Sequence, residues 1–122
     1  MITPKKFIKE FKKNNLKYFT GVPDSILSGL INYLNLSKHG CVHRIAANEG
    51  SAIGQAIGYF IAKKKVPVVY FQNSGISHAL NPLASVANQK IFGIPMILLV
   101  GYRGDPKIKD EPQHYRIGPN TK

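Results

Sequence analysis

The chain has 122 residues, which is enough for one domain with a core of its own. Hydrophobic residues make up 43% of it, which argues against a disordered tail, and no stretch approaches the roughly 20 apolar residues of a membrane span. The 17 Lys and Arg against 6 Asp and Glu give a net charge of +11, which favours anionic partners without distinguishing phosphorylated ligands from nucleic acid or acidic membranes.

The first predicted element is a helix with a strongly basic surface. Thr3 followed by Pro4 predicts its start, and it runs to about residue 14. Six lysines fall within the first 17 residues and flank an apolar stripe, so we interpret them as a solvated helix face. The segment lacks the continuous apolar stretch of a secretory signal, and Cys41 has no second cysteine to pair with, so we expect a cytoplasmic protein.

Two strands and two helices are predicted next. A short strand covers 18–22, and Asp24 is the expected N-cap of a helix whose apolar residues recur at helical spacing up to residue 34. A strand over 42–47 then leads into a helix from Asn48 to about Lys63.

The second half of the chain continues the same alternation. A strand over 66–71, rich in β-branched and aromatic residues, is followed by a turn at 73–75. A helix is expected from Ser77 or Pro82 to Asn88, and the apolar run 95–100 predicts a strand covered on both faces. Glycine, proline and charge predict a loop-rich tail over 101–122. The expected fold is therefore α/β, a three-layer α/β/α sandwich with a mostly parallel sheet.

Polar residues and glycines follow each predicted strand. In a parallel sheet these junctions lie at one edge, where such sheets bind ligands, so we expect them to line one cleft. The four junctions are Gly21-Val22-Pro23-Asp24-Ser25, Asn48-Glu49-Gly50, Gln72-Asn73-Ser74-Gly75 and Gly101-Tyr102-Arg103-Gly104. Glu49 stands in the first turn of a helix, where it is placed to act on a ligand. The simpler reading is an acidic residue that the helix dipole stabilises by about 0.3–1 kcal/mol.

These junctions, in order, resemble the N-terminal, pyrimidine-binding domain of thiamine-diphosphate-dependent decarboxylases. Three further segments strengthen the likeness: Asn81-Pro82-Leu83, Ile94-Pro95-Met96 and Asp110-Glu111-Pro112-Gln113-His114. The phosphonopyruvate decarboxylases are most similar, and the sulfopyruvate decarboxylase alpha subunits come next. The ordered series extends over nearly the whole chain.

The resemblance implies a catalytic role for Glu49. The matching glutamate of the family hydrogen-bonds the N1′ atom of the cofactor's aminopyrimidine and promotes the imino tautomer that removes the proton from thiazolium C2. It also implies that residues of the third junction contact the cofactor ring or hold the helix of Glu49. Those residues are Gln72, Asn73, Ser74 and Gly75, although turn chemistry alone would favour the same residue types.

The resemblance places the substrate, a small anionic 2-oxo acid, near the other junctions. Asp24 and Ser25 are candidate substrate residues, with helix capping as the alternative. Gln113 and His114 match positions that face the reacting carbonyl; His114 would transfer protons or bind an oxyanion, or else be an exposed loop histidine. Arg103 offers a forked cation for a phosphonate or sulfonate, with a solvated loop arginine as the alternative.

Three glycines recur every four residues on the helix that begins near Asn48. Gly50, Gly54 and Gly58 each weaken a helix by roughly 0.5–1 kcal/mol relative to alanine, which indicates a close approach on that face. We expect a subunit interface in a homo- or hetero-oligomer, since family enzymes form their cofactor sites between subunits. Tight packing on the chain's own sheet is the alternative.

The family's second half binds the diphosphate through Mg²⁺ with a Gly-Asp-Gly motif. Here Gly104-Asp105 is followed by Pro106, so we expect no metal site in this chain and a truncated domain with apolar surface that favours self-association. The missing diphosphate-binding half would be another domain or subunit. The histidines show no metal-binding spacing, because Gly40 and a strand start separate His39 from His43.

The leading hypothesis is the cofactor-activating part of a decarboxylase that converts 3-phosphonopyruvate to phosphonoacetaldehyde and CO₂, inactive without its other half. Sulfopyruvate is the alternative substrate. A basic module that binds anions or nucleic acid is the alternative of another class, suggested by the charge of +11. We expect neither nucleic acid nor membrane as a partner, because the aromatic residues lie in core-like runs and no nucleic-acid motif is present.

Overall fold

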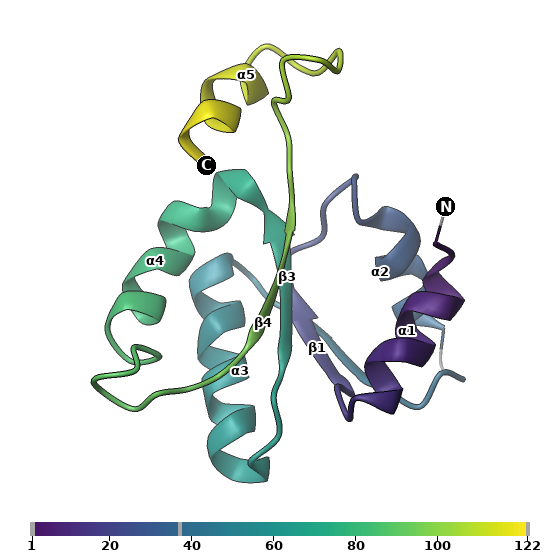
Figure 1. The fold of residues 1–122 in the computed structure, drawn as a ribbon, viewed down its shortest axis with the longest axis vertical. Coiled ribbons are helices and arrows are strands. Elements are labelled where there is room, and N and C mark those ends of the chain that lie inside the picture. The colour runs from purple at the N-terminus through teal and green to yellow at the C-terminus, as the bar shows by residue number, and fades with distance from the viewer. Residues whose placement is uncertain (1, 37, 122) are drawn as a thin grey trace.

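The computed structural model describes residues 2–36 and 38–121. A parallel four-stranded sheet, in the order β2-β1-β3-β4, lies between two helical layers (Figure 1). The strands are β1 (Tyr18–Gly21), β2 (Val42–Ile45), β3 (Val68–Gln72) and β4 (Ile97–Gly101). This arrangement confirms the predicted α/β/α sandwich.

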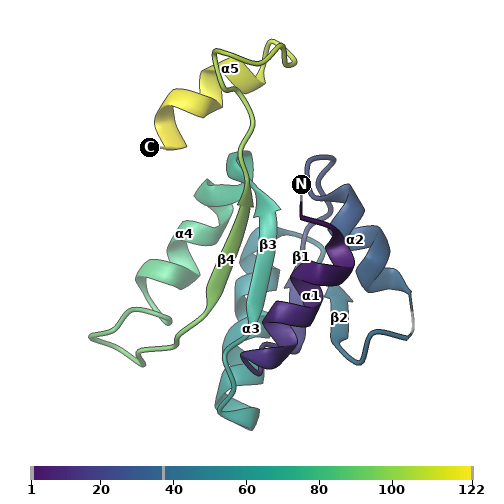
Figure 2. The ribbon, with the colours of Figure 1, turned by 45° about the vertical axis from the view of Figure 1, so that its right-hand side comes forward.

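The helices cover the two faces of the sheet in pairs. Helices α1 (Pro4–Lys13) and α2 (Ser28–Asn35) lie on one face, and α3 (Glu49–Lys63) and α4 (Ile76–Ala84) lie on the other (Figures 1 and 2). The chain moves from β1 outward to β2 and then returns through α3 to β3 on the other side of β1. Strand order therefore reverses beside β1, and the carboxyl ends at such a switch point are where ligands bind in open α/β sheets.

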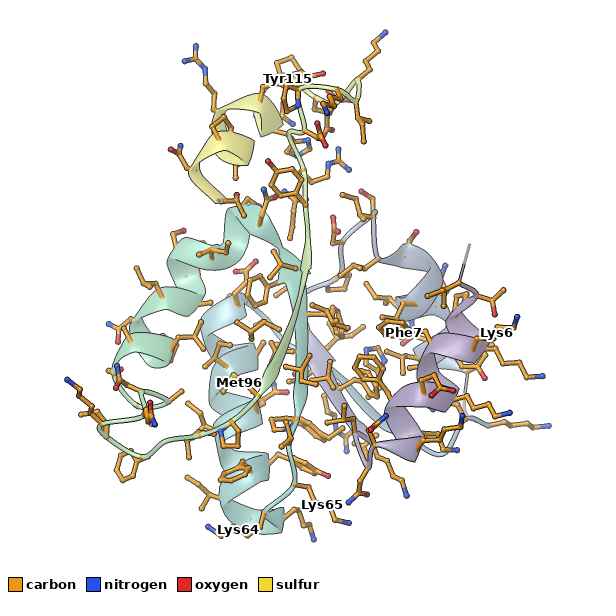
Figure 3. The ribbon with its side chains drawn as sticks, in the orientation of Figure 1. Lys6, Phe7, Lys64, Lys65, Met96 and Tyr115 are labelled. Atoms are coloured by element: carbon orange, nitrogen blue, oxygen red, sulfur yellow. The ribbon has the colours of Figure 1, made fainter. Side chains whose placement is uncertain are left out.

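The core has two parts because side chains of a strand alternate between the faces of the sheet. Val69 and Phe71 of β3 are buried against α3 and α4, whereas Val68 is buried on the side of α1 and α2. Figure 3 shows side chains filling the space between layers, with Phe7 of α1 directed toward the sheet and Lys6 directed away from it.

Both long helices begin at side-chain caps. The Thr3 hydroxyl accepts the backbone N–H of Lys6 at 3.4 Å, and Pro4 occupies the first helical position, as predicted. The Asn48 amide oxygen accepts the N–H of Ser51 at 2.8 Å and so fixes the start of α3. The cap places Glu49 in the first turn.

Strands begin and end slightly away from their predicted limits. β3 and β4 each start two residues after the expected position, because Pro67 and Pro95 have no backbone N–H for the strand ladder. β2 ends at Ile45, before the predicted end at Ala47.

Three helical predictions were wrong in detail. Helix α2 begins at Ser28, and its start has no side-chain cap, so Asp24 does not cap it. Helix α4 ends at Ala84, four residues early, after a proline inside the helix at Pro82. The tail forms a short helix, α5 (His114–Ile117), and a 3₁₀ turn, η2 (Gly118–Thr121), because it is tied to the end of β4 by the contacts described below.

An apolar hollow of about 520 Å³ lies beside the edge strand β4. Its walls include Leu98 and Val100 of β4, Phe7 of α1, and Ile26 and Leu27 before α2. Leu98 is 38% exposed there. The predicted apolar surface is thus present. Within the described residues, no helix has the length and apolar character that a membrane crossing requires.

Candidate functional site

Contacts join all four strand-end junctions at the carboxyl edge of the sheet. Glu49 of the second junction lies against Gly75 of the third. Asn73 of the third is hydrogen-bonded to Arg103 of the fourth. Arg103 in turn reaches Ser25 of the first junction at 2.7 Å. The four junctions that parallel topology predicts to lie together are therefore in contact at one edge, while a ligand cleft between them stays a prediction.

Glu49 is sheltered at this edge. Its side chain is 13% exposed, although the residue stands in the first turn of a surface helix. The dipole of α3 stabilises a negative charge at this end. The carboxylate is thus largely shielded from bulk water at the edge of the sheet.

Gly75 makes room for the Glu49 side chain. A Cβ atom on Gly75 would fall well under 3.0 Å from Cγ, Cδ and Oε1 of Glu49, closer than real Cβ contacts come. The backbone of Gly75 has ordinary angles, φ −81° and ψ −4°, so conformational freedom is not the reason for the glycine. Glycine at this position leaves the space that the Glu49 carboxylate occupies.

His78 is a neighbour of Glu49 that the sequence did not identify. Its Nδ1 lies 3.1 Å from Glu49 Oε2, a contact in which the Nδ1–H form of the ring donates. The ring is 71% exposed, so it covers the carboxylate from the solvent side. Its position in the first turn of α4, directly after the junction that contains Gly75, was the available signal.

Asp24 has a buried carboxylate with no hydrogen-bond partner among the described residues. The residue is 7% exposed and packs against Gly101 at the end of β4, where a Cβ atom would collide with its Oδ2. Buried carboxylates normally have partners, and the lack of one is typical of sites that are completed by a ligand or substrate. This placement replaces the predicted capping role.

Arg103 is the centre of a hydrogen-bonded cluster. Its guanidinium donates to Asp110 in a forked pair, with Nη2 2.5 Å from Oδ1 and Nε 3.0 Å from Oδ2. Nη1 donates to the Ser25 hydroxyl at 2.7 Å. The side chain is 18% exposed, so Arg103 is not the solvated loop arginine considered above. Its charge is compensated by Asp110, and an anionic substrate would meet a paired cation.

Asp110 was part of the recognised motif but had no predicted role. Burial would raise the pKa of its carboxyl group, but hydrogen bonds outweigh this effect and hold the pKa well below its ordinary value. The donors are the backbone N–H of Gly104, the His114 ring, the backbone N–H of Glu111 and the Arg103 guanidinium. Asp110 is therefore a fixed negative charge at neutral pH.

His114 lies inside the cluster rather than in an exposed loop. Its Nδ1 is 2.8 Å from Asp110 Oδ1 and 2.9 Å from Arg103 Nη2, and the side chain is 13% exposed. Nδ1 therefore faces both an acceptor and donors: the Nδ1–H form of the ring donates to Asp110, and the other tautomer accepts from Nε and Nη2 of Arg103. Its neighbour Gln113 is exposed at the start of α5.

The third junction, residues 72–75, is stabilised by hydrogen bonds within itself and to the C-terminal tail. Asn73 is 3% exposed; its amide donates to the Arg103 carbonyl and the Thr121 hydroxyl, both at 2.9 Å, and its oxygen accepts the Arg103 N–H at 3.2 Å. The Gln72 amide donates to Ser74 Oγ at 2.8 Å. Asn73 thus positions the edge of the site, and direct ligand contact by this junction stays a prediction.

Of the three helix glycines, two face open space. A Cβ on Gly54 or Gly58 would have nothing within 4 Å, so packing on the chain's own sheet does not explain them. Gly50 differs, since a Cβ there would lie 3.2 Å from the His78 carbonyl oxygen. The subunit interface stays a prediction.

The family model described as thiamine pyrophosphate enzyme, N-terminal TPP binding domain, matches residues 3–118. The chain belongs to this family. It is 33% identical to the sulfopyruvate decarboxylase subunit alpha of Methanocaldococcus jannaschii, with 79% of this chain and 54% of that protein covered. It is 36% identical to the phosphonopyruvate decarboxylase of Streptomyces hygroscopicus, with 80% of this chain and 23% of that protein covered.

Solved structures support the fold of this TPP-binding domain. A benzoylformate decarboxylase from Polynucleobacter necessarius superposes with a TM-score of 0.71 at 22% identity, covering 92% of this chain and 20% of that one. A protein from Mycobacterium smegmatis that is described as a thiamin diphosphate-dependent enzyme gives a TM-score of 0.68 at 19% identity, covering 84% of this chain and 19% of that one. The chain therefore spans about half of the length of the sulfopyruvate decarboxylase alpha subunit, and a quarter or less of the phosphonopyruvate and benzoylformate decarboxylases.

The geometry of the site fits the pyrimidine end of the family's cofactor. A sheltered carboxylate, Glu49, lies against Gly75, and a second buried carboxyl group, that of Asp24, lacks a partner among the described residues. The described residues contain no group of three or more His, Cys, Asp or Glu side chains that could hold a metal ion.

Proposed function

We propose that the chain is the cofactor-activating part of a thiamine-diphosphate-dependent 2-oxo acid decarboxylase. The observation that carries this proposal is the sheltered Glu49 carboxylate at the carboxyl edge of the sheet, 13% exposed and backed by Gly75. The family match over residues 3–118 supports the same role.

Glu49 would hold and exchange a proton at its carboxylate, against the pyrimidine ring of the cofactor. The apolar core under α3 and the cap at Asn48 fix the helix, so the carboxylate is placed before the ligand arrives. His78 excludes water from one side of it. Bound thiamine diphosphate would supply the electron sink that makes loss of CO₂ possible.

The cluster around Arg103 would act on the substrate side. His114 would transfer a proton through Nε2, because Asp110 and Arg103 both contact the opposite nitrogen, Nδ1. Ser25, Arg103 and Asp24 would orient the 2-oxo acid, and the exposed Gln113 would contact it from α5. Gln72, Ser74 and Gly75 would contact the cofactor, while Asn73 holds their junction in place.

We propose 3-phosphonopyruvate as the substrate, because the Streptomyces relatives are phosphonopyruvate decarboxylases of 35–36% identity. Sulfopyruvate is the second candidate. The share of each relative's length that the chain covers favours sulfopyruvate, because the chain spans 54–60% of the sulfopyruvate decarboxylase alpha subunits and 23–24% of the phosphonopyruvate decarboxylases.

The diphosphate and its Mg²⁺ would be held by another domain or subunit, in a homo- or hetero-oligomer. The apolar hollow of about 520 Å³ beside the edge strand β4 supports this, because burying such a surface stabilises an interface. Much of the cofactor's affinity comes from a metal clamp on the diphosphate, so this chain alone should bind the cofactor weakly.

The test is to combine the chain with its diphosphate-binding half, thiamine diphosphate and Mg²⁺, and to measure CO₂ release from 3-phosphonopyruvate and from sulfopyruvate. Glu49→Gln should abolish release from both acids. Glu10→Gln is the matched control, since Glu10 is an exposed glutamate on α1 whose partner is Lys13. Near-normal turnover by Glu49→Gln would remove the proposed role, and the ratio of the two rates identifies the substrate.

A further inference from the structure

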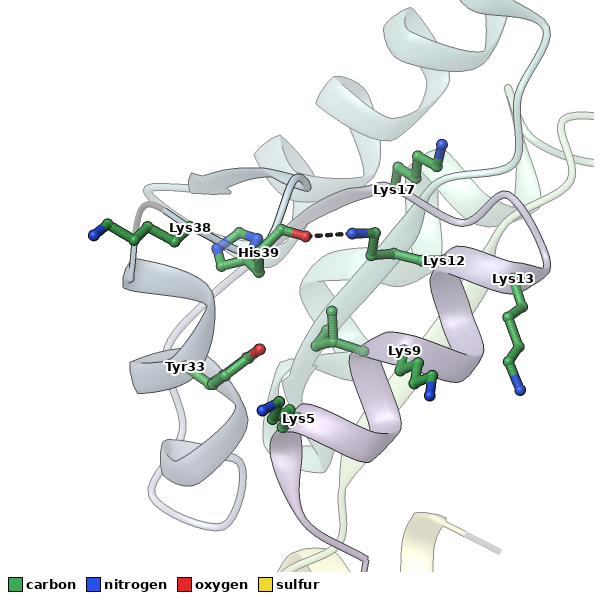
Figure 4. Close-up of a pocket in the computed structure, with 9 residues that line it drawn as sticks. Lys5, Lys9, Lys12, Lys13, Lys17, Tyr33, Lys38 and His39 are labelled. Carbon is green, nitrogen blue, oxygen red and sulfur yellow. Dashed lines mark hydrogen bonds between the residues drawn. The ribbon is translucent and has the colours of Figure 1, made fainter.

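A second concave site lies on the outer side of α1 and α2, away from the strand-end junctions. It is a hollow of about 470 Å³, and six of the nine residues that line it are lysines (Figure 4). These are Lys5, Lys9, Lys12, Lys13, Lys17 and Lys38. None of the nine lining residues is acidic. Glu10 on α1 lies close by and pairs with Lys13 at 2.7 Å, so one of the six positive charges is compensated.

The lysines that line this hollow come from separate segments of the chain. Lys5, Lys9 and Lys12 follow helical spacing along α1, Lys17 precedes β1, and Lys38 precedes β2. Figure 4 shows them on the segments that surround the hollow, with the Lys12 ammonium directed toward His39 and the side chains of Lys13 and Lys38 directed outward. The sequence predicts a solvated helix face, which accounts for the lysines of α1 only. Lys17 and Lys38 lie outside α1, so that face does not explain why they line the same hollow.

One wall of the hollow is fixed by hydrogen bonds. The Lys12 ammonium donates to the His39 carbonyl oxygen at 2.7 Å and so ties α1 to the segment before β2 (Figure 4). The His39 ring bridges two backbone groups, with Nε2 2.7 Å from the Leu34 oxygen and Nδ1 3.1 Å from the Cys41 nitrogen. The hollow is therefore formed before any ligand binds, which lowers the ordering cost of binding.

The charges repel one another in the empty hollow. Five uncompensated ammonium groups around one concave surface raise the local potential and concentrate counter-ions there. Neither core cluster uses their charged ends, since the buried residues of α1 and α2 that face the sheet are apolar. A ligand that carries several negative charges would remove this repulsion.

We propose that this hollow binds a small ligand that carries a chain of phosphate groups. Its volume of about 470 Å³ is within the range of small-molecule sites, roughly 300–1,000 Å³. Multiple lysines suit phosphate oxygens because each ammonium offers three donors and a point charge. Tyr33 is the one Phe, Tyr or Trp residue that lines the hollow. The lining therefore lacks the series of aromatic side chains on which a single-stranded nucleic acid stacks its bases.

The proposal is independent of the proposed decarboxylase role. The hollow lies over α1 and α2, whereas Glu49 belongs to α3 on the other side of the sheet (Figure 1). Failure of either proposal leaves the other standing.

The test is a titration of the full chain with sodium tripolyphosphate at physiological salt, followed by calorimetry and by amide NMR shifts. ATP is titrated in parallel, because inorganic polyphosphate and nucleotides are the two sources of this chemistry. We expect saturable binding, with the largest shifts at residues 9–17 and 38–40. Binding of either phosphate compound there supports the proposal, and the tighter of the two identifies the source.

Two triple variants of equal net charge locate the site. Lys5→Gln/Lys9→Gln/Lys38→Gln removes three charges of the hollow, and Lys65→Gln/Lys90→Gln/Lys107→Gln removes three exposed lysines elsewhere. Lys12 is left in place because its contact with His39 supports the wall. The hollow variant should bind at least about tenfold more weakly, and the control should stay within about twofold of the unaltered chain.

Equal weakening in both variants would mean a diffuse field rather than a site, and would overturn the proposal. The absence of saturable binding of both tripolyphosphate and ATP would also overturn the proposal. A single-stranded RNA is titrated as a further check, and RNA binding that tripolyphosphate does not displace would overturn the proposal as well. Circular dichroism checks that both variants fold. If the triple variant does not fold, Lys9→Gln alone should still weaken binding, and unchanged affinity would overturn the proposal.

Discussion

The substitution Gly75→Ala separates the placement of the Glu49 carboxylate from the stability of the fold. The new Cβ atom would collide with Cγ, Cδ and Oε1 of Glu49, all atoms of one flexible side chain. The backbone at Gly75 already has angles that alanine adopts, φ −81° and ψ −4°. The collision can therefore be relieved by rotation of Glu49 without a change in the backbone.

The expected effect on stability is small and the effect on catalysis is large. Replacing glycine by alanine at compatible backbone angles stabilises a protein by about 0.4–1 kcal/mol, which offsets part of the strain at Glu49. We therefore expect a change of less than about 1 kcal/mol in the free energy of unfolding. The carboxylate must retreat by about 1 Å, and a displacement of that size can lower the rate of a positioned reaction about a hundredfold.

The assay is CO₂ release by the reconstituted enzyme, together with urea denaturation of the variant. Gly29→Ala is the matched control: Gly29 lies on α2, and a Cβ there would make an ordinary contact, 3.7 Å from Pro4 Cγ. Because misplacement acts on the chemical step, kcat should fall in Gly75→Ala while KM changes little. Gly29→Ala should keep both values.

A double variant gives the sharper check on this reasoning. If Gly75 acts through Glu49, truncating that side chain should remove the collision, so Gly75→Ala should raise the free energy of unfolding more in a Glu49→Ala background than in the unaltered chain. An equal change in both backgrounds would show that Gly75 has a separate role. Full activity of Gly75→Ala would show that the position of the carboxylate is not critical.

Three further predictions concern other parts of the chain. Asp24→Asn replaces a buried carboxyl group that lacks a partner among the described residues with an amide that cannot ionise, so thermal denaturation should show a gain of about 1–3 kcal/mol in the free energy of unfolding while turnover falls; a loss of stability would reveal a partner for the carboxyl group. Burial, and then the nearby His39, lowers the pKa of His43 below its ordinary value of 6.5. The unfolded chain therefore takes up that proton first, and stability should fall as pH drops below about 6.5. Urea denaturation of His43→Gln should show a weaker pH dependence, and an unchanged slope would contradict this. Gly58→Ala fills open space and should stabilise the isolated chain by about 0.5–1 kcal/mol, while sedimentation should show weaker association if the interface lies on that face.

The fold could be predicted because short apolar segments, typical of strands, alternate along the chain with segments whose apolar residues recur at helical spacing. That alternation predicts a parallel sheet, and parallel topology alone brings the strand-end junctions to one edge. The strand starts were displaced where Pro67 and Pro95 withhold a backbone N–H. Periodicity does not record this local effect.

The contacts within the site were less accessible to sequence reasoning. Glu49 and His78 are 29 residues apart, and Ser25 and Arg103 are 78 apart, so no local pattern links either pair. Asp110 follows Arg103 within seven residues, yet only the folded tail brings the two together as a forked pair. Asp24 has the residue type of a helix cap, and tertiary packing turned its side chain inward instead.

The position of the lysine hollow limits what the large positive charge can do for catalysis. Ions screen exposed charges over about 8 Å at physiological ionic strength, and a helix with its side chains is about 10 Å across. The six lysines stand outside α1 and α2, and the sheet separates them from Glu49. They therefore add little to the speed at which a negatively charged acid reaches the reacting groups, and the apparent second-order rate of decarboxylation should change only slightly as salt is added.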